Sequence, residues 1–258
     1  MCKLTSVLFS SAIALALLAG TAQAQARGGP DWRDCNGRDV DARISACTRI
    51  IDQGGGRNSQ MRAGAFNNRG IAYFSRGEFD RAVRDFDEAI AAKPNNPVLY
   101  HNRGMALYNK GDNEGAIRSY EEAIGRNPKY SIAHNDRANV YFRMKEYDKA
   151  ISGYDEAVRL QPRDPVLYAN RGNTYRMRGD YDQALRDFDD AIRLNPREAG
   201  SIYGRSQVYA DKGDANRAIA DLDEPGTLER DQRFANRSDN CLWLFKWDAM
   251  VTVYPNLF

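Results

Sequence analysis

Four prolines recur in this chain at one fixed interval. Pro94, Pro128, Pro162 and Pro196 are each separated from the next by 34 residues. A fixed period of this length is typical of tandem structural units that stack, each burying its apolar side against its neighbours. The spacing therefore predicts an elongated repeat domain. A domain of that kind offers a long binding surface more often than a catalytic pocket.

The residues between the prolines predict that each unit is a pair of helices. From Phe79 to Ile90, apolar residues stand at i, i+3, i+4, i+7, i+10 and i+11, which is one stripe on an α-helix. The same stripe returns from Tyr181 to Ile192. Proline ends this helix, and an acidic residue suits its N-terminus. Glycines suited to a helix C-cap mark the turn before it: Gly77, Gly111, Gly179 and Gly213.

Three further columns of residues resemble the tetratricopeptide repeat (TPR) family. The resemblance implies an all-α fold, an α-solenoid of tandem 34-residue helix-turn-helix repeats, with four repeats over residues 63–198 and a partial fifth over residues 199–223. One departure is constant, because repeat position 7, often leucine in the family, is arginine in every copy. Counted from Ala63, the family's small residue at position 8 is Gly70, Gly104, Ala138 and Gly172; its alanine at position 20 is Ala82, Ala116, Ala150 and Ala184; its aromatic at position 24 is Phe86, Tyr120, Tyr154 and Phe188.

The arginine at repeat position 7 is matched by an acidic residue at position 25 in every copy. A guanidinium makes charge-assisted bonds to a carboxylate, so we expect each arginine to reach a second-helix acid within one repeat or between repeats. The alternative is a set of solvated charges with little effect on stability. The arginines are Arg69, Arg103, Arg137, Arg171 and Arg205, and the acids are Asp87, Glu121, Asp155, Asp189 and Asp223.

Residues 1–24 have the composition of a secretory signal peptide. Lys3 precedes an apolar run over residues 7–19, and Ala22-Gln23-Ala24 is a small-x-small cleavage site. The run is shorter than the roughly 20 residues that a membrane-spanning helix needs, and no later stretch is long and apolar enough. We therefore expect cleavage after Ala24 and a periplasmic or secreted mature protein without a transmembrane span.

Residues 25–62 precede the first repeat and are expected to cap its open end. They hold one expected helix, at roughly residues 39–53. Cys35 and Cys47 flank a short segment, which predicts a disulfide in an oxidising compartment. Metal binding is a poor alternative, because no paired cysteine or histidine lies nearby. Cys241 is left without an obvious partner.

Residues 224–258 form a tail without repeat character. Pro225 and Gly226 stand where the second helix of the fifth repeat should continue, and Leu242–Trp247 is dense in large apolar side chains. Three interpretations stay open. The tail folds back as a cap on the last repeat, it is an adhesive segment for a membrane or a partner, or it is an aberrant end such as a reading-frame change would leave.

Composition and motifs favour neither an enzyme nor a nucleic-acid-binding protein. The chain has 37 basic and 35 acidic residues, a net charge of +2, and no case for binding polyanions. His101 and His134 lack acids or cysteines at ligand spacing, so no metal site is expected. Gly54-Gly55-Gly56 lacks the Gly-Lys-Ser/Thr ending of a phosphate loop, and the carboxylates recur at repeated positions. We expect a non-enzymatic protein that uses no cofactor.

The resemblance implies a binding surface on the first helices of the repeats. In TPR proteins, positions 2, 5, 6, 9, 12 and 13 face a concave groove, and some members hold an extended peptide with an asparagine row at position 6. A side-chain amide both donates and accepts, so it can pair with peptide backbone of any sequence. The peptide-binding candidates are Asn67, Asn68, His101, Asn102, Asn135, Asp136, Asn139, Asn170, Asn173, Tyr108, Phe142, Arg143 and Arg176.

These features together predict a protein–protein interaction scaffold or adaptor. It would bind an extended peptide or a partner helix in the groove, and its partner is a protein or peptide whose identity the residues do not give. One alternative is a self-associating component of an envelope assembly that uses the solenoid ends and the tail. Another is an accessory domain of an enzyme, with chemistry in the non-repeat ends.

Overall fold

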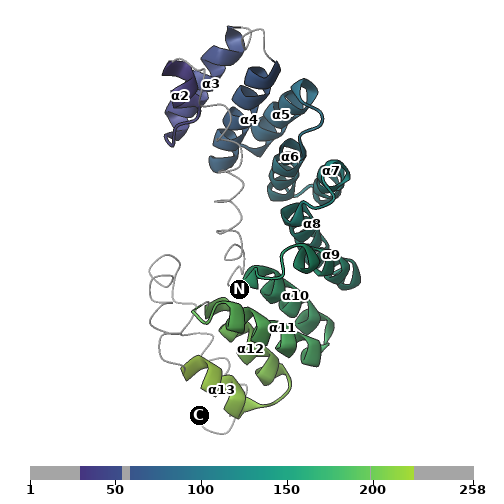
Figure 1. Cartoon of the computed structure of the whole chain (residues 1–258). Helices are drawn as coiled ribbons and strands as arrows, with labels where there is room; N and C mark the ends of the chain where they lie inside the picture. Colours follow the sequence, from purple (N-terminus) through teal and green to yellow (C-terminus); the bar gives the residue numbers. More distant parts are fainter. Residues whose placement is uncertain (1–29, 54–58, 198, 224–258) are drawn as a thin grey trace. The chain divides into compact units, whose positions relative to one another are not determined.

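The described part of the chain folds into helices joined by short turns. A computed structural model describes residues 30–53, 59–197 and 199–223. From α4 to α13 the helices alternate as first and second members of successive repeats (Figure 1), which confirms the α-solenoid of helix pairs. The helices are α2 (Pro30–Cys35), α3 (Val40–Asp52), α4 (Ser59–Ser75), α5 (Phe79–Ala92), α6 (Pro97–Lys110), α7 (Asn113–Arg126), α8 (Ser131–Arg143), α9 (Tyr147–Leu160), α10 (Pro165–Arg178), α11 (Tyr181–Leu194), α12 (Ala199–Asp211) and α13 (Ala215–Asp223).

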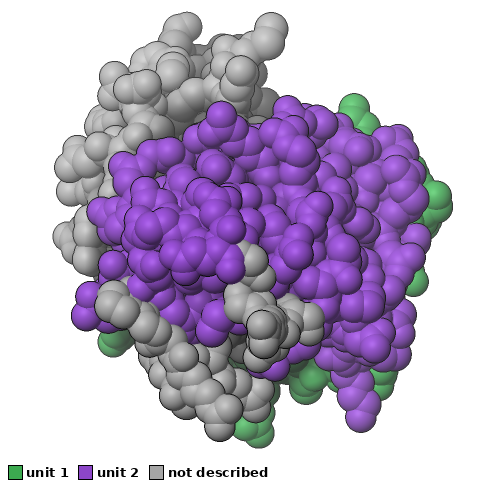
Figure 2. Space-filling model, turned by 90° about the horizontal axis from the view of Figure 1, so that it is seen from above, with its two compact units in different colours: residues 1–3, 141–258 green, residues 4–140 purple. Residues whose placement is uncertain are grey.

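The chain divides into two compact units between Val140 and Tyr141, inside α8 (Figure 2). Unit 2, purple in Figure 2, holds α2 to α7 and the first part of α8, and unit 1, green, holds the later helices. In unit 2 each helix from α2 to α6 contacts the helix that follows it, and in unit 1 each helix from α9 to α12 does the same. First helices of neighbouring repeats also meet, α4 with α6 in unit 2 and α10 with α12 in unit 1. The first-helix face is therefore continuous from α4 to α6 in unit 2, and from α10 to α12 in unit 1.

Local signals explain where the first helices begin and end. Pro97 and Pro165 occupy the first turns of α6 and α10, where a missing N–H costs nothing. The side chains of Asn96 and Asp164 accept the N–H groups of the second helical residues, at 3.1 and 3.0 Å. Both helices end at a glycine in the left-handed conformation, Gly111 and Gly179.

The turn between α8 and α9 departs from this pattern, because Lys145 stands where the other copies have glycine. Lys145 has φ of +61°, and it is the one non-glycine residue with positive φ among the described residues. A side chain in this region clashes with its own backbone at a cost of about 1 to 2 kcal/mol. The turn is therefore a strained point in an otherwise regular series.

We expect Lys145→Gly to raise the free energy of unfolding by about 0.5 to 1 kcal/mol, because relief of the strain exceeds the added freedom of the unfolded chain. Urea denaturation followed by circular dichroism measures the change. Gly179→Ala is the matched control and should lower stability by about 1 kcal/mol. A Cβ at Gly179 would meet nothing within 4 Å, so the backbone alone accounts for that loss. A Lys145→Gly protein less stable than the parent would show that this turn tolerates lysine.

The core repeats one contact between an aromatic ring and a small residue. The second-helix aromatics Phe86, Tyr120, Tyr154 and Phe188 are all buried. A Cβ added at Gly104 would lie 2.7 Å from the Tyr120 ring of its own repeat, and one added at Gly70 would lie 2.8 Å from the Phe86 ring. The glycines are therefore small because a ring occupies the space beside them.

The N-terminal region of the described chain is a pair of helices rather than the single helix that we expected. The second, α3, agrees with the expected residues, but Pro30–Cys35 is also helical. The predicted disulfide between Cys35 and Cys47 is confirmed and joins α2 to α3. Trp32 lies against Gly64 of α4, where an added Cβ would come within 2.7 Å of its ring. The six-residue α2 is too short to be stable alone, and these two contacts hold it in place.

Several expectations lie outside the described residues. They are the signal peptide and its cleavage site at residues 1–24, the whole tail at residues 224–258 with Cys241, and the side chain of Asp223. Among the described residues, no helix combines the length and the apolar character needed to cross a membrane.

Candidate functional site

Three of the position 7 arginines bind a carboxylate of their own repeat that the sequence reasoning missed. Arg171 donates from Nε and Nη2 to the two carboxylate oxygens of Asp187, at 2.8 and 2.7 Å. Arg205 holds Asp221 and Arg69 holds Asp85 in the same bidentate manner. These acids stand at repeat position 23, next to the buried aromatic in the first and fourth repeats and next to Leu222 in the fifth, and each is buried itself. The sequence did contain a sign of these contacts, because position 23 is Asp, Ser or Gly in every copy and never a large side chain.

The predicted pairing with position 25 is also confirmed, and it runs between repeats. Arg171 Nη1 donates to Asp155 at 2.7 Å, and Arg205 Nη1 donates to Asp189 at 2.7 Å. The arginines of the second and third repeats reach back in the same way, from Arg103 to Asp87 at 3.0 Å and from Arg137 to Glu121 at 3.7 Å. An arginine at position 7 thus contacts the second helix before it and, where position 23 is Asp or Ser, the second helix after it.

Burial and hydrogen bonding act in opposite directions on these pairs. The Asp187 carboxylate raises the pKa of Arg171 by accepting its hydrogen bonds. Burial raises the pKa of Asp187 itself, and the bonds from Arg171 offset only part of that effect. The free-energy cost of removing the two charges from water therefore offsets much of the electrostatic attraction between Arg171 and Asp187, as is usual for a buried ion pair. Such a pair adds little net stability while intact, but losing one partner is costly.

Arg137 lacks the second contact. Its Nε is buried and has no hydrogen-bond partner among the described residues. The residue sixteen positions later, which is Asp85, Asp187 or Asp221 in other copies, is Gly153 here. In the second repeat the equivalent residue is Ser119, whose hydroxyl accepts from Arg103 Nε at 3.0 Å.

In unit 2, the predicted binding amides bond to one another across the repeats. Asn102 Nδ2 donates to Asn67 Oδ1 at 2.9 Å, thirty-five residues earlier in the chain. Asn68 Nδ2 donates to Asn36 Oδ1 at 2.8 Å, in the turn after α2. His101 Nε2 lies 2.7 Å from Asp136 Oδ2, which repeats the spacing of the Asn102–Asn67 bond. Positions 5 and 6 therefore form a row that joins neighbouring repeats.

Two further asparagines of unit 2 gather around Asp136: Asn135 at position 5 and Asn139 at position 9. Asn135 and Asn139 donate to its Oδ1 at 3.0 and 3.3 Å. Asn102, Asn135 and Asp136 are buried, and so is Tyr108 at position 12. These side chains do not point into bulk solvent, and most of their polar atoms face one another.

The two histidines have separate structural contacts. His134 Nε2 donates to the carbonyl of Pro128 at 3.0 Å. Tyr100 and Tyr168, at the same repeat position, donate their hydroxyls to Pro94 and Pro162. His134 therefore makes the hydrogen bond to the proline carbonyl that Tyr100 and Tyr168 make in their repeats. No group of three or more His, Cys, Asp or Glu residues that could hold a metal lies within residues 30–53, 59–197 and 199–223.

In unit 1, the first-helix face is more polar and carries one exposed apolar side chain. Arg176 donates to Asp211 at 2.9 Å and lies 3.4 Å from the oxygen of Gln207. Asn170 is buried, Asn173 and Phe142 are partly buried, and Arg143 is exposed. Met177, which we did not predict as a site residue, has 48% of its surface exposed. Its repeat position, 13, is one that the family resemblance already assigns to the groove.

The open part of the first-helix face lies at repeat positions 9, 12 and 13. In unit 2 these positions hold partly buried Ile71, Phe74 and Met105 and exposed Asn109. Phe74 packs on Phe79 with ring centroids 5.6 Å apart. The surface combines apolar patches with amide groups, and that chemistry fits an extended polypeptide.

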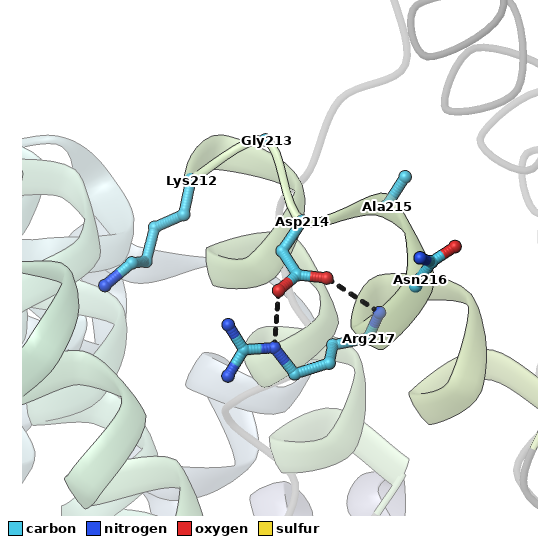
Figure 3. A pocket seen from close by; sticks show the side chains of 6 residues that line it. All are labelled: Lys212, Gly213, Asp214, Ala215, Asn216 and Arg217. Carbon is cyan, nitrogen blue, oxygen red and sulfur yellow. Dashed lines mark hydrogen bonds and ion pairs between the residues drawn. The ribbon is translucent and has the colours of Figure 1, made fainter.

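A hollow of about 390 Å³ lies at the turn between α12 and α13 (Figure 3). Its lining is a single run of residues, from Lys212 to Arg217. Asp214 accepts from the backbone N–H of Arg217 at 3.1 Å and from its Nε at 2.5 Å, and these bonds lower the pKa of the Asp214 carboxyl. The hollow is the surface of a helix-capping turn and brings no distant residues together.

Comparison with known proteins agrees with this architecture. Three models described as tetratricopeptide or TPR repeat match residues 70–111, 101–165 and 165–198, which together run from residue 70 to residue 198 without a gap. No curated protein matches the chain.

Solved structures of three proteins illustrate the similarity. MamA from Desulfovibrio magneticus RS-1 is 23% identical, with a TM-score of 0.60 over 66% of this chain and 97% of that one. A tetratricopeptide repeat protein from Parabacteroides merdae is 18% identical, with a TM-score of 0.68 over 87% and 84%. YrrB, described as a TPR protein with an unusual peptide-binding site, is 20% identical, with a TM-score of 0.56 over 73% and 99%. Identities this low show the fold alone. With its helix pairs, its 34-residue period and the family models that match it, the chain belongs to the tetratricopeptide repeat family.

Proposed function

We propose that this protein is a non-enzymatic scaffold that binds an extended peptide along the first-helix face. The observation that carries the proposal is the half-exposed Met177 on a helix whose neighbouring face residues are polar. Methionine adapts its shape to different apolar side chains and is common at surfaces that bind varied partners. The peptide-binding site named for YrrB supports the same use of this fold.

We propose two roles for the predicted site residues, and their contacts support this division. Positions 5 and 6 (Asn67, Asn68, His101, Asn102, Asn135, Asp136 and Asn170) hold the repeats in register, since most of them are buried or already bonded. Direct contact with peptide falls to positions 9, 12 and 13. A single substitution in the buried row would therefore disturb folding as well as binding, so it is a poor test.

Substitutions at the open positions test the proposal more cleanly. Peptides selected from a random displayed library against the full chain should lose about tenfold or more in affinity when the methionine of the unit that they bind is changed, Met105→Glu in unit 2 or Met177→Glu in unit 1. Each change places a charge on the apolar contact. The controls are Arg118→Glu and Arg186→Glu, which alter exposed residues of second helices. Isothermal titration calorimetry measures the dissociation constants. Peptides that bind both methionine variants as tightly as the parent, yet lose affinity for a control, would place binding on the second helices instead.

We further propose that the protein acts outside the cytoplasm. The Cys35–Cys47 disulfide supports this location, because such bonds persist in oxidising compartments. The composition of residues 1–24, which is typical of a secretory signal peptide, also supports this location. N-terminal sequencing of the protein recovered from its native cells should begin at Gln25, whereas a protein that begins at Met1 in the cytosolic fraction would refute it.

A further inference from the structure

The last described helix leaves an apolar face uncovered. Ile219 has 41% of its surface exposed, and Leu222 follows it one turn later on the same face of α13. Ile219 stands at the same repeat position as Ile151 and Leu185 of unit 1. Ile151 is buried, and Leu185 is partly buried against Phe188 and Val208. The exposure of Ile219 is therefore not a property of its repeat position.

Earlier junctions in unit 1 show what normally covers this face. The next first helix lies over the second helix, α10 over α9 and α12 over α11. Phe188, which has the repeat position of Leu222, lies against Gly204 and Val208 of α12. After α13, the chain reaches Pro225 and Gly226 and has no further repeat. In the earlier repeats the next first helix covers this face. No such helix is expected directly after α13, because Pro225 and Gly226 follow and residues 224–258 lack the repeat pattern.

We infer that residues Leu242–Trp247 of the same chain cover the Ile219–Leu222 face. The segment has Trp243, Phe245 and Trp247 among its six residues, which gives it the apolar area to replace a missing helix. A nine-residue helix is only about 13 Å long. The connecting residues 224–241 extend at about 3.3 Å each, so they reach any point on α13. Attachment within one chain also gives the segment a high effective concentration that a separate partner lacks.

Tryptophan accessibility provides the test, because two of the three tryptophans lie in the proposed segment and the third, Trp32, is buried in unit 2. In the full chain, acrylamide should quench all three weakly. Ile219→Asp should expose the two tail tryptophans and raise the quenching constant about threefold or more, because covering the face would then bury an unpaired charge. Met177→Asp, on another exposed apolar residue, should leave quenching unchanged. Hydrogen exchange adds a reciprocal measurement, and Trp243→Ser with Trp247→Ser should speed exchange of the α13 amides by about tenfold.

The possible results separate the occupants of this face. Strong quenching in the unmodified chain, or no response to Ile219→Asp, would overturn the inference. Protection that appears only at high protein concentration, together with a doubled mass in light scattering, would assign the face to a second copy and also overturn it. The inference is independent of peptide binding at positions 9, 12 and 13, so either proposal can fail without the other.

Discussion

Replacing Phe188 with alanine is expected to lower the free energy of unfolding of unit 1 by about 3 to 5 kcal/mol. The Phe188 side chain is completely buried, and it fills the space between its own repeat and Gly204 of the next. Alanine would leave a cavity that the helices cannot close without moving apart. Because repeats are stabilised mainly by their neighbours, the loss should spread to α11 and α12 together.

Hydrogen exchange measured by mass spectrometry resolves where that loss falls. Exchange should accelerate in α11 and α12 and stay nearly unchanged in α4 and α5 of unit 2. Phe188→Leu is the conservative control, with an expected loss below about 1.5 kcal/mol. Met177→Ala, at a half-exposed residue, should change stability by no more than about 0.5 kcal/mol. A decrease of less than about 1 kcal/mol in the free energy of unfolding for Phe188→Ala would mean that the ring contributes little to the packing of these two repeats.

The second large effect is expected at Asp187, one of two acids that share Arg171. Asp187→Ala should lower stability by about 3 kcal/mol, because it leaves a guanidinium with 17% exposure short of its bidentate partner. Asp155→Ala is the matched control, since Asp155 contacts the same arginine but has 53% of its side chain exposed. That change should cost less than about 1 kcal/mol.

Salt provides a second comparison between the two variants. Added sodium chloride should shrink the effect of Asp155→Ala and leave that of Asp187→Ala largely intact, because water and ions screen only the exposed pair. Thermal and urea unfolding both measure the difference. Equal losses for the two variants would show that the position 23 acids are no more important than the position 25 acids.

The periodic sequence was sufficient to predict the helix pairs, their turns and the family. Each of these features depends on residues close in the chain, such as the apolar stripe of α5 or the glycine after α6. The arginine pairs with position 25 were also predictable, because both members recur in register. The position 23 acids were missed because an aspartate beside the buried Phe188 was not expected to be buried as well.

The predicted site was harder to evaluate from sequence, because a polar residue on a first helix has two uses. From the sequence alone, Asn102 is a candidate for binding peptide. Its hydrogen bond to Asn67 depends on the packing of two repeats, which the sequence does not give directly. The helical state of Pro30–Cys35 was missed for a related reason. A six-residue segment has little propensity of its own, and its disulfide and the Trp32–Gly64 contact are what order it.

The arginine at position 7 carries a consequence for how the array changes in length. Arg171 bonds to an acid sixteen residues behind it and another sixteen residues ahead, and Arg205 repeats both distances. Duplication of residues 165–198 would therefore give the new copy a matching carboxylate on each side. Gain or loss of whole modules preserves these ion pairs, whereas an insertion between a position 7 arginine and the position 23 acid of its repeat changes the spacing of that pair.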